Sequence, residues 1–249
     1  MCGRFSLEAQ WENLLKVMGI AQTSRLEPEM LPRYNIAPTQ PIFVVRNGHD
    51  DAREGVLVRW GFVPAWVKNP KDFTLLINAR SETAAEKPSF RNAIRHRRVL
   101  IPANGFYEWR RFGKGQKSQA YWVRPRDGGI MAFGGLMETW ADHDGNGNEI
   151  DTACIVTTAA NETFAPIHHR LPLIVHPKDS DRWLDCKSTT VDEVKDIMVP
   201  APDDFFEAVP VGDAVNKVAN ATKDIQAPVD LPRQGEADEP KDDGQLSMF

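Results

Sequence analysis

The chain has 249 residues, of which 41% are hydrophobic and 26% charged, and its formal net charge is −5. This is the composition of an ordinary globular protein with a substantial core. No apolar run is long enough to cross a bilayer and no signal-peptide pattern is present, so we expect a cytoplasmic protein without a membrane partner. Cys2, Cys154 and Cys186 lie far apart with no Cys-x-x-Cys pair or His/Cys cluster, which argues against disulfides and zinc.

The negative charge is concentrated at the C-terminal end. Residues 228–249 contain six acidic and two basic residues, a net of −4, which leaves −1 for the body that precedes them. Within that body, four arginines occur in eight residues: Arg91, Arg95, Arg97 and Arg98. A near-neutral body with a basic face can bind phosphate groups, so the total charge does not exclude a nucleic-acid partner. We expect phosphate contacts from this cluster; the alternative is a solvated helix end, the usual position of a run of charges.

In chain order, the pattern begins with an amphipathic helix over 6–18, with Ser6 as its N-cap and Gly19 as its stop. β-Strands are predicted for segments rich in Val, Ile, Phe, Tyr and Trp: 42–46, 55–63, 97–102, 105–110, 119–124, 130–136 and 153–158. Helical patterns interrupt them near 82–95, 178–186 and 190–198. We predict one α+β domain over residues 2–225, in which mixed β-sheets form a barrel-like core with peripheral helices.

Two segments fall outside this domain pattern. Residues 226–249 are rich in Pro, Gly, Asp, Glu and Lys, cannot bury enough apolar surface to offset their ordering entropy, and are predicted to be disordered. The loop 142–147 matches the first positions of an EF-hand calcium loop, but Ala153 stands where the bidentate Glu belongs. A polar hairpin turn is the better interpretation, and no metal is expected.

Cys2 follows the initiator Met1, which is normally removed when the next residue is small. An N-terminal cysteine carries an α-amine and a thiol on one carbon skeleton, and both are partly nucleophilic near neutral pH. Such a 1,2-aminothiol attacks an aldehyde through nitrogen to form a Schiff base and then closes through sulfur to a thiazolidine ring. Taken alone, Cys2 is better explained as an accident of the start of the chain.

Several motifs further along the chain argue against Cys2 being an accident of the start. They are MCGRF (1–5), YNIAP (34–38), WGFVPAW (60–66), NARSET (78–83), RVLIPANGFYEW (98–109), VTTAAN (156–161) and IHHRLP (167–172). In order and spacing they resemble the SOS response-associated peptidase (SRAP) family, from Cys2 to about Val218. Members of that family bind single-stranded DNA and cross-link to abasic sites through an N-terminal cysteine. The resemblance implies that this chain senses abasic sites in single-stranded DNA and shields them in a thiazolidine cross-link.

By the same resemblance, the catalytic residues are Cys2, Asn78, Glu108 and His168. Asn78 would hold the sugar or the Cys2 amine, although the residue by itself is better explained as a turn at a strand end. Glu108, inside an aromatic strand, would move protons to and from the amine, the alternative being a solvent-facing strand residue. His168 would assist ring opening or protonate the sugar oxygen. Its neighbour His169 is not excluded from that role.

For DNA contact, the resemblance implicates residues that flank the reactive ones. Arg4, Arg80 and Arg170 would contact phosphates or base edges, and Thr157 would position a sugar or phosphate group. Trp66 either stacks on a base exposed beside the lesion or packs in the core, with equal weight. No element resembles a base-reading helix, so recognition should depend on the lesion and not on base sequence.

Further expectations complete the functional prediction. No cofactor is needed, since Cys2 supplies both nucleophiles, and the Schiff base also permits β-elimination, a weak lyase activity. The same residues could serve an N-terminal-nucleophile cysteine peptidase or amidohydrolase with autocatalytic removal of Met1, and a third alternative is a passive DNA-binding module.

The final peptide resembles the pentapeptide by which bacterial DNA-processing proteins bind the replication sliding clamp: Gln245, Leu246, Ser247, Met248 and Phe249.

Overall fold

The structure is a computed structural model that describes residues 2–20, 22–23, 30–48, 50–113, 115–142 and 147–231. Its strands are β1 (Phe5–Leu7), β2 (Gln22–Thr23), β3 (Arg33–Ile36), β4 (Pro41–Asn47), β5 (Arg53–Trp60), β6 (Asn78–Arg80), β7 (Arg98–Ala103), β8 (Gly105–Arg110), β9 (Gln119–Pro125), β10 (Met131–Ala141), β11 (Glu149–Ala159), β12 (Arg170–Pro172) and β13 (Phe206–Val211). Its α-helices are α1 (Trp11–Met18), α2 (Ala93–His96) and α3 (Ser180–Leu184), and its 3-10 turns are η2 (Pro70–Asp72), η3 (Pro177–Asp179), η4 (Asp192–Val194), η5 (Asp213–Asn216) and η6 (Lys223–Gln226).

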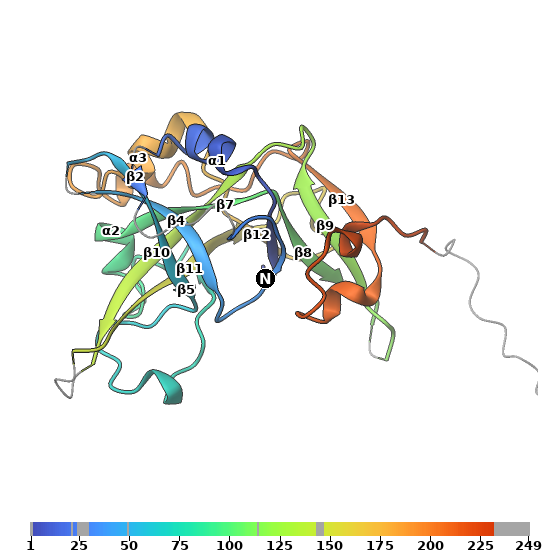
Figure 1. Cartoon of the computed structure of the whole chain (residues 1–249), viewed down its shortest axis with the longest axis horizontal. Helices are drawn as coiled ribbons and strands as arrows, with labels where there is room; N and C mark the ends of the chain where they lie inside the picture. Colours follow the sequence, from blue (N-terminus) through green and yellow to red (C-terminus); the bar gives the residue numbers. More distant parts are fainter. Residues whose placement is uncertain are drawn as a thin grey trace, which may run out of the picture.

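Five of these strands close into a barrel (Figure 1). The antiparallel neighbours run in the order β11, β10, β7, β4 and β5. The ring is closed by a parallel pairing of β11 with β5, in which Thr152 lies opposite Arg59 and Ala153 opposite Trp60. Closure removes exposed strand edges, a common arrangement for β-rich cores. The predicted α+β domain with a barrel-like core is confirmed.

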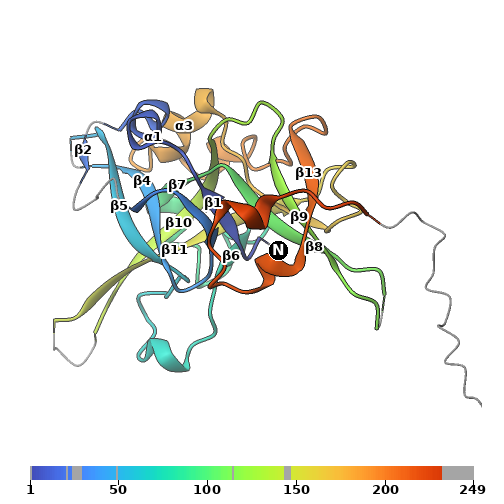
Figure 2. The same cartoon turned by 45° about the vertical axis from the view of Figure 1, so that its right-hand side comes forward.

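A second sheet, in the order β13, β9, β8, β1 and β3, lies against the barrel. Figures 1 and 2 both place β8, β9 and β13 on the side away from β4 and β5. Aromatic rings join the two sheets into one core: Phe5 of β1 packs edge-on against Trp60 of β5 at 5.2 Å and against Phe133 of β10 at 5.9 Å between ring centroids. Phe106 of β8 contacts Phe133 at 6.1 Å. β1, which follows Cys2, therefore lies where the second sheet packs against the barrel.

The helix predicted over 6–18 begins later than expected, at Trp11. Ser6 is not an N-cap: it is buried in β1 opposite Gly105, and its hydroxyl donates to the Glu8 carboxylate at 2.9 Å. Gly19 ends the helix as predicted, with φ of 64° in the left-handed region. Pairing with β8 buries residues 5–7, and this tertiary contact overrides the local helical spacing.

Other element predictions were partly wrong for the same reason. The segment 82–95 is a series of turns that becomes α-helical only at Ala93, and 190–198 contains just the short η4. The segment 178–186 agrees with η3 followed by α3. No strand was predicted for β13, an edge strand that pairs with β9 from Phe206 to Val211. β13 has the same length as β8 but contains no aromatic residue after Phe206 and includes Pro210, which weakens a strand pattern in the sequence.

The arginine cluster 91–98 is not a single surface. Arg98 is 1% exposed, and its guanidinium donates to the backbone carbonyls of Ile94, Trp183, Asp185 and Thr189 at 2.6–2.9 Å. The prediction of phosphate contacts is therefore wrong for Arg98, which instead holds α2 and the α3 segment against β7. Arg97 forms an ion pair with Glu138 at 3.2 Å, whereas Arg91 and Arg95 are exposed.

The C-terminal segment packs on the second sheet as far as residue 229. The Gln226 amide donates to the Glu8 carboxylate at 2.6 Å, Pro228 bridges to Val211, and the Val229 N–H donates to the Pro210 carbonyl at 2.9 Å. The boundary expected at residue 225 falls inside this segment. Residues 232–249 of the predicted tail and 143–146 of the rejected calcium loop lie outside the described residues. Among the residues that are described, no helix has the length and apolar character needed to span a bilayer.

Candidate active site

The four residues predicted to be catalytic come from four separate segments of the chain. Cys2 precedes β1, Glu108 lies on β8, Asn78 begins β6, and His168 lies in the turn before β12. The pairing of β1 with β8 and of β6 with β11 brings these segments to the space between the two sheets. A hydrogen bond joins Asn78 to Cys2, and the charge of Glu108 acts on both Cys2 and His168. The structure therefore assembles the other three residues around Cys2.

Asn78 contacts the backbone of Cys2. Its Nδ2 donates to the Cys2 carbonyl oxygen at 3.0 Å, and β6 is held in place by its parallel pairing with β11, in which Asn78 lies opposite Ile155. Cys2 itself is only 1% exposed, and its Sγ donates weakly to the Arg4 carbonyl at 3.9 Å. Asn78 thus fixes the start of the folded chain from the barrel side.

Burial determines the protonation state of this site. Burial raises the pKa of the Cys2 thiol far above its ordinary value, and the nearby negative charge of Glu108 raises it further. Burial also lowers the pKa of His168, while Glu108 opposes that change. Near neutral pH the thiol is therefore protonated and the imidazole is neutral. Nδ1 of His168 lies 3.0 Å from the Arg170 N–H, which donates to it, and 3.3 Å from the Arg170 carbonyl oxygen. The shorter contact favours the tautomer in which Nδ1 accepts and the ring proton is on Nε2.

Arg170 and Thr157, both expected to contact DNA, belong to an internal network beside His168. The buried Arg170 guanidinium donates to both carboxylate oxygens of Glu82, at 2.6 and 2.8 Å. It also donates to the Thr157 carbonyl at 2.6 Å and to its hydroxyl at 3.3 Å. Glu82 was missed by the sequence analysis, although it lies in the NARSET motif. The hydrogen bonds of this network hold β11, β12 and the turn after β6 together.

Arg4 is held from the opposite side of the site. Its Nη1 donates to Asn35 Oδ1 at 2.7 Å and to the Val215 carbonyl at 2.9 Å, and its guanidinium lies 6.0 Å from the Trp109 ring centroid. Burial lowers the pKa of Arg4. Asn35, 4% exposed, also donates to backbone carbonyls of the segment after η5, those of Lys217 and Asn220. Sequence analysis missed this function of Asn35, whose only signal was the YNIAP motif.

Arg80 and Trp66 are the two expected DNA-contacting residues with exposed side chains. Trp66 is 56% exposed and packs edge-on against Phe73, at 5.6 Å between ring centroids. A small cluster that includes Val67 and Trp140 supports this loop from beneath. Trp66 is therefore a surface residue and not part of the core. Arg80 ends β6, two residues beyond Asn78.

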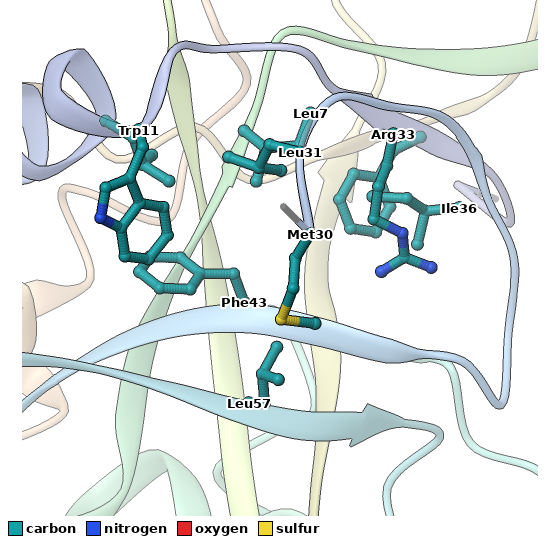
Figure 3. Close-up of a pocket in the computed structure, with 10 residues that line it drawn as sticks. Leu7, Trp11, Met30, Leu31, Arg33, Ile36, Phe43 and Leu57 are labelled. Atoms are coloured by element: carbon teal, nitrogen blue, oxygen red, sulfur yellow. The ribbon is translucent and has the colours of Figure 1, made fainter. Parts of the chain in front are cut away.

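An apolar pocket near α1 is separate from this site (Figure 3). Its volume is about 20 Å³, and none of the four catalytic candidates lines it; its walls include Leu7, Trp11, Met30, Leu31, Phe43 and Leu57. This volume is close to the space that one water molecule needs, so it cannot hold a sugar or a base. Among the described residues, no group of three His, Cys, Asp or Glu side chains is placed to hold a metal ion.

Comparisons with known proteins agree with the motifs. The family model described as SOS response associated peptidase (SRAP) matches residues 1–218. The chain is 36% identical over 225 residues to the abasic site processing protein YoqW of Bacillus subtilis, covering 90% of this chain and 98% of YoqW. It is 30% identical to the abasic site processing protein YedK of Escherichia coli, covering 92% of this chain and 100% of YedK. A crystal structure of a Bacteroides thetaiotaomicron protein matches with a TM-score of 0.81 at 25% identity, covering 92% of this chain and 100% of that one. The chain therefore belongs to the SRAP family.

Proposed function

We propose that this protein recognises abasic sites in single-stranded DNA and bonds to them covalently through Cys2 once Met1 has been removed. The observation that carries the proposal is the assembly of Asn78, Glu108 and His168 around Cys2. Relatives that align over nearly the whole chain are named abasic site processing proteins, which supports the choice of substrate. The open-chain form of an abasic deoxyribose presents the aldehyde that an aminothiol attacks.

The reaction loses one water molecule and needs no cofactor. The Cys2 amine adds to the C1′ aldehyde, and the resulting carbinolamine expels water to give a Schiff base. The thiol then adds to the same carbon, and its proton passes to the nitrogen as the thiazolidine ring closes. Because burial keeps the thiol protonated, that proton is available at the closing step. β-Elimination from the Schiff base would give a weak lyase activity.

The side chains around Cys2 suit proton transfer. Glu108, 4% exposed, would take protons from and return them to the amine and the carbinolamine oxygen. Neutral His168, with its proton on Nε2, would donate to the sugar ring oxygen as the hemiacetal opens. Asn78, which already holds the Cys2 carbonyl, would keep the amine in position. In this scheme the exposed Arg80 and Trp66 contact phosphate and base. Arg4, Thr157 and Arg170 support the site through their internal hydrogen bonds.

The test is incubation with a single-stranded oligonucleotide that carries one abasic site, followed by denaturing electrophoresis and intact mass measurement. We expect a heat-stable adduct with the mass of protein plus DNA minus one water. Cys2→Ala and protein that retains Met1 should form none, and Cys186→Ala should react normally. Cys2→Ser keeps the α-amine, so borohydride should trap its Schiff base although no stable ring forms. Absence of any adduct with correctly processed protein would refute the proposal.

An N-terminal-nucleophile peptidase or amidohydrolase is the alternative that the same residues allow. In the chain that retains Met1, the Cys2 nitrogen is a peptide amide and the raised thiol pKa leaves little thiolate, which is the nucleophile of cysteine hydrolases. A cysteine hydrolase needs the thiolate for its first bond, whereas cross-linking begins at the amine and the thiol adds only afterwards, to the activated Schiff-base carbon. This difference favours cross-linking over hydrolysis. Autocatalytic removal of Met1 is tested by intact mass: a Glu108→Ala precursor that keeps Met1, when wild type loses it, supports self-processing. A passive DNA-binding module predicts that Cys2→Ala binds normally and that wild type forms no adduct.

We also propose that the C-terminal pentapeptide, residues 245–249, binds the replication sliding clamp. Its sequence, Gln-Leu-Ser-Met-Phe, follows the charged segment 232–244, which would act as a linker. This would keep the protein near replication forks, where single-stranded abasic sites arise. Deleting residues 245–249 should abolish pull-down by purified clamp without changing adduct formation. Unchanged pull-down would contradict the proposal.

A further inference from the structure

Two adjacent histidines, His168 and His169, form a stacked pair in this protein. Their ring centroids are 4.4 Å apart and their planes differ by 25°. His168 is half-buried beside the catalytic candidates, whereas His169 is exposed. The backbone fixes both residues, because the His169 carbonyl accepts from the Ala160 N–H at 3.1 Å and the Arg170 N–H donates to His168 Nδ1 at 3.0 Å. The pair is therefore a defined feature of the turn between β11 and β12.

We infer that His169 is a positioning residue for His168: its ring fixes the plane of the His168 imidazole, and its charge keeps His168 neutral as the solution becomes mildly acidic. The inference rests on the proposed function only in assigning a proton transfer to His168 Nε2. It distinguishes the two histidines, which the sequence alone could not separate. His169 touches no reacting atom in this scheme and acts through its neighbour.

The charges that face His168 determine the direction of the effect. Glu108, on β8, favours a charged His168, while the amino terminus and His169 oppose it. The thiol of Cys2 is held in its uncharged form by burial, and the Arg170 guanidinium is turned toward Glu82 and Thr157. Burial lowers the pKa of His168. A charge on the exposed His169 therefore adds to burial in opposing protonation of His168.

Once His169 carries a proton, a second imidazolium ring 4.4 Å away would be repelled. The His168 titration is thereby moved to lower pH, and its Nε2 proton and Nδ1 acceptor are retained. The stack has a second effect: it restricts rotation of the His168 ring. The ring therefore keeps the orientation in which Nδ1 accepts from Arg170 and Nε2 faces the proposed substrate. Charge and ring contact can be separated experimentally, because Phe has a flat ring without a titratable group.

The test compares His169→Phe and His169→Ala with His96→Phe, a control at another exposed histidine. NMR titration of the His168 ring in DNA-free protein should show a midpoint about 0.5 pH unit higher in both His169 variants and unchanged in the control. The rate of adduct formation at pH 7 should fall about 3-fold in His169→Ala and stay near wild type in His169→Phe. At pH 5.5, His169→Phe should be slower than wild type because more of its His168 is charged.

Each readout can overturn one part of the inference. A His168 midpoint within about 0.1 pH unit of wild type in both variants refutes the effect of His169 charge. A wild-type rate at pH 7 in His169→Ala refutes the positioning effect. The NMR titration requires no reaction with DNA, so a failure of the proposed cross-linking function would appear as absent adduct in every protein while the titration still reports on the stack.

Discussion

The three cysteines differ sharply in their surroundings. Cys2 and Cys154 are buried, with 1% and 0% exposure, whereas Cys186 is half-buried and its Sγ accepts the Arg98 N–H at 3.3 Å. Burial raises the pKa of all three thiols. Alkylation requires that the reagent reaches the sulfur and that the sulfur is a thiolate. Burial therefore protects Cys2 and Cys154 from alkylation in both ways.

In protein that retains Met1, we therefore expect iodoacetamide at pH 8 to label Cys186 first. Cys2 and Cys154 should be labelled at comparable rates only after unfolding in urea. The rate at Cys186 should rise with pH beyond the ordinary thiol range, because its raised pKa delays formation of the thiolate. Peptide mass spectrometry gives the order of labelling. Native Cys2 that reacts as fast as Cys186 would contradict the burial seen here.

Asn78 allows a sharp test of the site, because its amide donates to a carbonyl. Asn78→Asp places an acceptor opposite the Cys2 carbonyl, so both the 3.0 Å hydrogen bond and the backbone position are lost. The rate of adduct formation should fall about 10-fold or more, and by less in Asn78→Ala, which removes the bond without repulsion. Asn92→Asp, at an exposed residue whose side chain makes no capping bond, is the matched control. A normal rate in Asn78→Asp would show that the bond is dispensable.

At the scale of elements, the Arg170–Glu82 ion pair connects β12 to the turn after β6. The Arg170 side chain is 9% exposed and the Glu82 side chain 50% exposed. Glu82→Gln removes the charge opposite a buried guanidinium, but water reaches Glu82, so we expect a loss of about 1–2 kcal/mol, less than for a fully buried pair. Urea unfolding gives this value, and Glu86→Gln, at an exposed neighbouring glutamate, should change little.

The same pair predicts a pH dependence of stability. The hydrogen bonds from Arg170 hold the pKa of Glu82 below its ordinary value of 4.5. A carboxyl with a lowered folded-state pKa stabilises the protein at pH values above the ordinary one, and this contribution is lost as the pH falls through the lowered pKa. Wild type should therefore lose stability more steeply than Glu82→Gln between about pH 5 and pH 3. Parallel curves for the two proteins would contradict the assignment.

Element predictions succeeded where a strand carries its own pattern. The segments 105–110 and 119–124 coincide with β8 and β9 because both are rich in aromatic and branched residues over their whole length. The predictions failed where a segment becomes a strand only because a distant strand pairs with it. Ser6 lies in a strand because Gly105 is opposite, and β6 has three residues that form a strand only because β11 is beside them.

For the whole molecule, the C-terminal segment closes the second sheet. A chain that ends at residue 225 would lose the Gln226–Glu8 bond and the pairing of Val229 with Pro210. We expect its Tm to fall by about 2–8 °C, from a loss of about 1–2 kcal/mol. A chain that ends at residue 231 keeps these contacts and should melt like the full protein. Differential scanning calorimetry distinguishes the two, and equal Tm values for both truncations would contradict the packing described here.

The sequence by itself determined the family, the α+β class and the four residues around which the proposed function is built, because motif order and strand composition are local properties. Only the tertiary structure decided that β5 and β11 close the barrel, that Arg98 is surrounded by carbonyls, and that Arg170 is paired with Glu82. Apart from the Ile94 carbonyl beside Arg98, these contacts join residues about 85 or more positions apart. No local pattern encodes a partner at that separation, since burial and pairing depend on which distant surfaces the closed fold brings together.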